Sequence, residues 1–83
     1  MEEIVKLEII SPLQTQMFDI EWVEIQAPHG SFVIGYGHND LTSLLKRQGK
    51  LTFKKMTGFE QSVVVSGGVV TIFDNKVIVI LEK

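Results

Sequence analysis

The stretch that decides the fold lies near the C-terminus: Val69-Val70-Thr71-Ile72-Phe73, then Asp74-Asn75-Lys76, then Val77-Ile78-Val79-Ile80-Leu81. Two runs of β-branched and apolar residues around a short polar loop are typical of a β-hairpin. Neither run alternates apolar with polar residues, which predicts strands buried on both faces. In so small a chain, the second face is expected to meet another protein. The alternative is that the opposite sheet and a loop cover it.

Outward from this hairpin, period-2 alternation dominates. Val5, Leu7 and Ile9 alternate with Lys6 and Glu8, as in a half-buried strand. Further strands or short apolar strand-like groups are predicted over residues 14–18, 20–27, 31–34 and 41–45, in a strand that begins with Leu51 and Phe53, and over residues 61–65, 69–73 and 77–81. No segment has the length and caps of a helix. The sequence therefore predicts an all-β fold, a small flattened barrel or sandwich of eight to ten short strands.

Length and composition exclude several classes of protein. The chain has 83 residues, no cysteine and a mean hydropathy of +0.21. One domain over residues 1–83 is expected, without disulfides or a thiolate metal site. The longest apolar run, Val77 to Leu81, is far shorter than a membrane-spanning helix, and no secretion signal is recognisable. The surplus of apolar residues favours a surface that a partner covers.

Charge is unevenly distributed. Residues 1–40 carry seven acidic side chains against Lys6, whereas residues 41–60 have a net charge of +4. The basic cluster runs from Lys46 to Lys55, near Phe53 and Phe59. It favours one alternative function, a free-standing small β-barrel module that acts as an adaptor or binds oligonucleotides through phosphate contacts and base stacking. The ordinary interpretation is a solvated strand edge protected by lysines. With a pI near 5.6, no general nucleic-acid partner is expected.

No residue set predicts catalysis or a cofactor. His29 and His38 lie beside glycines in predicted loops and lack further metal ligands at suitable spacing. Ser66-Gly67-Gly68 is too short for a phosphate-binding loop and instead indicates a bulge or a close backbone approach. Trp22 is predicted to point outward, as interface tryptophans do, unless the phase of its strand is shifted by one residue.

The order of short motifs resembles the N-terminal β-sandwich domain of the epsilon subunit of F-type ATP synthase, which is called delta in mitochondria. The resemblance covers Ile4 to Leu81. Its four parts are Leu7-Glu8-Ile9-Ile10-Ser11-Pro12 with Met17-Phe18; Val23-Glu24-Ile25-Gln26 with Gly30; Gly37-His38 with Leu41, Leu44-Leu45-Lys46 and Gly49; and Ser66-Gly67-Gly68-Val69-Val70 with Asn75-Lys76-Val77-Ile78-Val79.

The resemblance implies a non-catalytic rotor subunit of a proton- or sodium-translocating synthase, which couples the gamma subunit to the ring of c subunits. It implies a peripheral protein, held by the complex at the cytoplasmic face of a bacterial membrane. The apolar final hairpin would face gamma, and the turns at Gly30 and Gly37-His38 would face the ring. The partner-binding residues that it implies are Ser11, Gly30, Ser31, Gly37, His38, Ser66, Gly67, Gly68, Val69 and Val79.

The chain departs from the family pattern at several positions. Tyr36 and Asn39-Asp40 stand where the family has prolines around its glycine-histidine pair, so this loop is expected to be less rigid. Ser31 replaces a glutamate that is often presented to the ring. One extra residue lies between Lys46 and Gly49. The sequence ends at Lys83, where the family's C-terminal helical hairpin would begin, so that hairpin is not expected here.

Overall fold

The computed structural model describes residues 3–82, and the whole of that range is β-structure and turns. Residues 1–2 and Lys83, which the predicted domain includes, lie outside the described residues. Within the described range, the all-β prediction is confirmed, at the lower end of the predicted strand number. The strands are β1 (Val5–Ile10), β2 (Thr15–Ala27), β3 (Gly30–Gly35), β4 (Leu41–Leu45), β5 (Gly49–Lys55), β6 (Glu60–Val65), β7 (Gly68–Phe73) and β8 (Lys76–Leu81).

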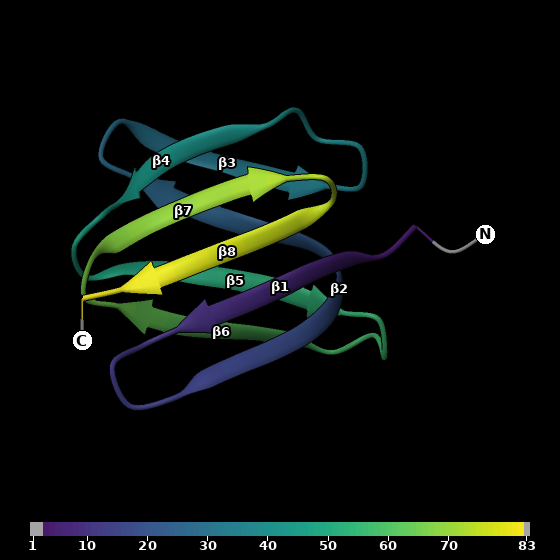
Figure 1. Ribbon diagram of the computed structural model, residues 1–83, viewed down its shortest axis with the longest axis horizontal. Helices are drawn as coiled ribbons and strands as arrows, with labels where there is room; N and C mark the ends of the chain where they lie inside the picture. Colours follow the sequence, from purple (N-terminus) through teal and green to yellow (C-terminus); the bar gives the residue numbers. More distant parts are fainter. Residues whose placement is uncertain (1–2, 83) are drawn as a thin grey trace.

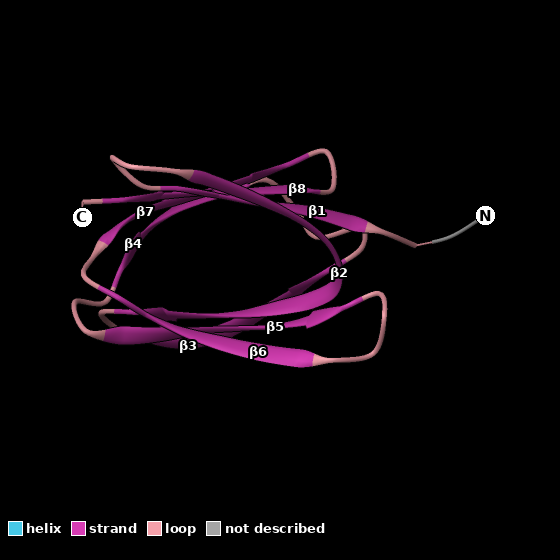
Figure 2. Cartoon of the chain, turned by 90° about the horizontal axis from the view of Figure 1, so that it is seen from below, coloured by secondary structure: helices cyan, strands magenta, loops and turns pink. Residues whose placement is uncertain are grey.

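All eight strands belong to one curled sheet, in the order β4-β7-β8-β1-β2-β5-β6, with β3 also paired to β2 (Figure 1). Pairing is antiparallel except between β1 and β8, which run parallel. Figure 2 shows the two resulting layers. β1, β7 and β8 lie in one layer and β3, β5 and β6 in the other, while β2 passes between them. The structure is therefore a flattened sandwich closed along one side by β2.

β2 corrects the prediction of two separate strands over residues 14–18 and 20–27. It is continuous over 13 residues, and Asp19 stays paired with Lys6 of β1. The direction change occurs by a register irregularity between Ile20 and Trp22 in the pairing with β5. A bulge bends a strand without ending its hydrogen-bond ladder, so no turn residue is needed where β2 crosses between the layers.

The core fills the space between the two layers. Its fifteen buried side chains are all apolar, and none of the residues from 3 to 82 places a polar side chain there. The predicted inward positions of β1 and of Val23 and Ile25 are confirmed. The core residues are Val5, Leu7, Ile9, Ile20, Val23, Ile25, Ile34, Leu45, Leu51, Phe53, Val65, Val70, Ile72, Val77 and Val79.

Gly68 confirms the predicted close backbone approach at the start of β7. Its φ is +143°, and a Cβ built on it would overlap the carbonyl oxygen of Ile80 on the neighbouring strand β8. Only glycine combines this backbone conformation with so close a neighbour. Gly67 is buried beside it, and its carbonyl accepts a hydrogen bond from the Glu82 amide at 3.3 Å. This segment therefore holds the two arms of the final hairpin together at its open end.

Candidate functional site: an apolar sheet face and two sets of turns

The outer face of the β4-β7-β8-β1 layer carries a row of apolar side chains. Strand register places Leu44 beside Val69, Val69 beside Ile80, and Ile80 beside Ile10. Leu44 is 63% exposed and Ile80 is 50% exposed, whereas Val69 and Ile10 are half-buried. We call Leu44, Val69, Ile80 and Ile10 the apolar row. It crosses four neighbouring strands, so the outer face of the final hairpin is uncovered in this chain.

This arrangement decides between the two interpretations of the hairpin's unbroken apolar runs. The opposite layer covers only the inner face, where Val70, Ile72, Val77 and Val79 lie. The idea that a loop covers the other face is wrong for the described residues. Val79, expected to contact gamma, is also a correction: its side chain is 0% exposed in the core and cannot reach a partner.

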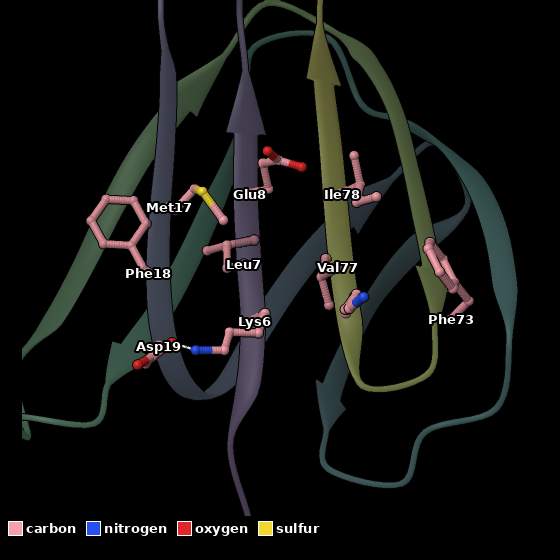
Figure 3. A pocket seen from close by; sticks show the side chains of 10 residues that line it. Lys6, Leu7, Glu8, Met17, Phe18, Asp19, Phe73, Val77 and Ile78 are labelled. Atoms are coloured by element: carbon pink, nitrogen blue, oxygen red, sulfur yellow. Dashed lines mark hydrogen bonds and ion pairs between the residues drawn. The ribbon is translucent and has the colours of Figure 1, made fainter.

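A shallow groove of about 570 Å³ lies beside the apolar row (Figure 3). Met17 and Ile78 give it apolar surface, and Phe73 stands at the end near the β7–β8 turn. At the same end, the Lys6 ammonium pairs with the Asp19 carboxylate at 2.6 Å. The whole face thus combines exposed apolar area with a few balanced charges, as protein interfaces do.

The predicted turn residues do not gather in one place. Gly30 begins β3 and Gly37-His38 follows its last residue, so the two turns lie at opposite ends of the sandwich (Figure 1). Ser11, Ser31 and the segment Ser66–Gly68 lie at the Gly30 end. His38 is half-buried, and its Nδ1 lies 2.7 Å from the Asn39 carbonyl oxygen. Gly67 is buried, which corrects its assignment as a contact residue.

The effect of the Ser66 hydroxyl on stability can be tested directly. Its Oγ is buried and has no hydrogen-bond partner among the described residues. An unpaired buried hydroxyl is costly, so Ser66→Ala should raise the free energy of unfolding by about 1 kcal/mol. Thermal denaturation should show a rise of roughly 4–8 °C. A fall in the melting temperature would mean that the hydroxyl makes a stabilising bond.

Three of the five cations of the basic cluster contact other groups of the fold. Arg47 lies 3.9 Å from Glu82, and Lys54 lies 3.5 Å from Glu21. Lys55 Nζ stands over the Phe18 ring at 5.3 Å. Phe53, proposed as a stacking platform, is wrong for that role because it is 0% exposed, although Phe59 is 74% exposed. The geometry gives little support to a nucleic-acid-binding module.

A titration tests that alternative. With Arg47 and Lys54 beside carboxylates and Lys55 over the Phe18 ring, we expect a fluorescent single-stranded oligonucleotide to bind more weakly than about 100 µM at 0.15 M salt, the weak end of non-specific binding. Binding tighter than that, weakening steeply as salt rises, would revive the basic-cluster hypothesis.

Trp22 confirms its predicted outward phase. It is half-buried on the outer face of β2 and lines a shallow hollow with Glu24 and Val33.

No group of three or more His, Cys, Asp or Glu side chains in residues 3–82 is arranged to hold a metal ion. The described range likewise holds no helix suited to crossing a membrane.

Taken together, the strands define a small β-sandwich with an exposed apolar face. The chain matches the family model for the delta/epsilon chain β-sandwich domain of ATP synthase over residues 4–83. It belongs to that family, which confirms the resemblance of its motifs.

Two solved structures share the fold. A chain in the Euglena gracilis mitochondrial ATP synthase, from an OSCP/F1/c-ring assembly, matches with a TM-score of 0.90 and 17% identity, covering 100% of this chain and 53% of that one. A chain in the Tetrahymena thermophila mitochondrial ATP synthase central stalk and c-ring matches with a TM-score of 0.79 and 16% identity, covering 95% and 63%. This chain is therefore shorter than both. A comparison with curated protein sequences finds no significant match.

Proposed function

We propose that this protein is a non-catalytic rotor subunit of an F-type ATP synthase, located in the central stalk between the gamma subunit and the c-ring. The family match over residues 4–83 carries the proposal. The two solved relatives come from assemblies that include the c-ring, and one is described as central stalk.

The apolar row is the surface that we assign to gamma. Exposed apolar side chains on four adjacent strands gain free energy when a partner removes them from water, at about 25 cal/mol per Å². Val69 keeps the role predicted for it, and Ile80 takes the place of Val79. Gly68 contributes by its close approach to β8, which fixes β7, the strand that carries Val69.

The two predicted ring-facing turns lie at opposite ends of β3, so we assign one of them, and not both, to the ring. Gly30 and Ser31 are exposed at one end of β3, and the Gly37-His38 loop lies at the other. Ser31 presents a hydroxyl where the family often presents a carboxylate, so the contact is less acidic. Ser11 lies in the β1–β2 turn. Its Oγ and its amide both donate hydrogen bonds to the Gln14 carbonyl oxygen, and these bonds close the turn.

The mechanical role follows from the fold. A packed core between two bonded layers deforms little, because protein interiors are close-packed. Such a domain, wedged between gamma and the ring, raises the free energy required for one to slip against the other. Proton or sodium flow through the ring would thus be transmitted as torque. The subunit would be peripheral, held at the cytoplasmic face of a bacterial membrane by the complex.

Co-purification tests this proposal. The tagged full chain, expressed with gamma and c subunits of the same organism, should be recovered in one complex with both. Single cysteines at Ser31 and His38 then report which end meets the ring, through cross-links to c-subunit loop cysteines. Recovery of the folded chain alone, without gamma or c, would contradict the proposal.

A further inference from the structure

Asn75 is an unusual choice for the turn that it occupies. The loop between Phe73 and Lys76 has two residues, and both Asp74 (φ +48°) and Asn75 (φ +58°) have positive φ. This is the signature of a type I′ hairpin turn, in which glycine is the preferred second residue. Asparagine adopts a positive φ at a higher energetic cost than glycine does. We therefore expect its side chain to make an interaction that glycine cannot make.

That contribution is a hydrogen bond to a distant loop. Asn75 Oδ1 accepts a hydrogen bond from the Gly37 amide at 2.7 Å, across 38 residues of sequence. The Asn75 main-chain carbonyl accepts another from the Lys6 amide of β1 at 3.0 Å. In Figure 1 the β7–β8 turn and the β3–β4 loop lie at the same end of the sandwich. Asn75 thereby links a rigid hairpin, the central strand β1 and a loop.

The β3–β4 loop has few other restraints. Within residues 36–40, the His38 amide bonds to the Gly35 carbonyl at 3.3 Å, and the His38 ring contacts its neighbour Asn39. Gly37 itself has a φ of +81° and open space around its Cβ position. The loop contains no proline to fix its backbone. Among the hydrogen bonds of the described residues, the one that the Gly37 amide donates to Asn75 is what joins Gly37 to another part of the fold.

We propose that Asn75 is the positioning residue of the β3–β4 loop. Its carboxamide oxygen accepts a hydrogen bond from the Gly37 amide and so keeps Gly37 and His38 in the conformation presented to the c-ring. The loop thus obtains from a long-range hydrogen bond the rigidity that its own sequence does not provide. The structural part of this inference stands alone, and its functional part rests on the proposed rotor role.

Two substitutions separate the side-chain bond from the turn. Asn75→Gly suits the positive φ but removes the acceptor, whereas Asn75→Asp keeps an oxygen in the same place. By ¹⁵N relaxation on the full chain, we expect the order parameter of the Gly37 amide to fall from about 0.85 to below 0.6 in Asn75→Gly. Asn75→Asp should keep the wild-type value. Both variants should unfold cooperatively and keep the amide spectrum of the core strands.

An unchanged Gly37 order parameter in folded Asn75→Gly would overturn the inference, whatever the protein binds. A second readout is the cross-link from a cysteine at His38 to the c-ring. Its yield should fall at least threefold in Asn75→Gly and recover in Asn75→Asp. If the loop loosens but the wild-type chain never enters the rotor complex, the proposed function fails and the positioning role of Asn75 stands.

Discussion

Replacing Gly68 with alanine should unfold the protein. The new Cβ would overlap the Ile80 carbonyl oxygen and lie 3.0 Å from its carbon, at a backbone φ of +143° that alanine disfavours. Both neighbours are backbone atoms of a paired strand, so neither can rotate away. We expect a loss of about 4 kcal/mol or more, a large share of a small domain's stability. Thermal denaturation would show a fall of more than about 15 °C, or no folded protein.

Gly58→Ala is the matched control. Gly58 has a φ of +99°, yet nothing lies within 4 Å of its Cβ position. Only the backbone conformation is penalised there, so the expected loss is about 1 kcal/mol. Equal effects at the two glycines would show that the close approach of β7 to Ile80 does not determine the cost.

Val79→Asp and Ile80→Asp should differ strongly in their effect on folding, although the two residues are neighbours. Val79 is fully buried, so Val79→Asp places an unpaired carboxylate in an apolar core and should cost about 3–5 kcal/mol or more. Ile80 is half-exposed on the apolar row, so Ile80→Asp should cost about 1 kcal/mol and leave a folded domain.

Partner binding completes this pair of predictions. Folded Ile80→Asp should lose gamma binding at least about 100-fold, because it places a charge in the middle of the desolvated face. Circular dichroism and urea denaturation establish the folded fraction of each variant. A folded Val79→Asp, or an unfolded Ile80→Asp, would mean that the two faces of β8 have been assigned in reverse.

The alternating strands were predictable because alternation specifies both strand and phase. In β1, charged residues at Lys6 and Glu8 fix Leu7 on the inner face, and the structure agrees. The hairpin turn and the close approach of Gly68 to the neighbouring backbone were also predictable. Short polar loops between apolar runs indicate hairpin turns, and glycine pairs within strands indicate bulges or close contacts between backbones. The family resemblance depended on the order of these same motifs.

The remaining features depend on information that the sequence does not carry locally. Val77 to Leu81 is apolar at every position, so hydropathy could not show that Val79 faces the core and Ile80 the solvent. The bulge in β2 left no turn residue to mark the crossing between layers. Phe53 looked available beside lysines, but its phase on β5 buries it. The hydrogen bond that the Gly37 amide donates to Asn75 Oδ1 joins segments that are far apart in the sequence and that only the fold brings together.

The central claim is that the outer face of β8 docks onto the gamma subunit. A calorimetric titration of purified gamma with the full chain should give a dissociation constant below about 1 µM. This value corresponds to a binding free energy beyond roughly −8 kcal/mol. Ile80→Asp, verified as folded, should bind at least about 100-fold more weakly. Equal affinity of the wild-type and Ile80→Asp chains, or no binding by the folded wild type, would contradict the claim.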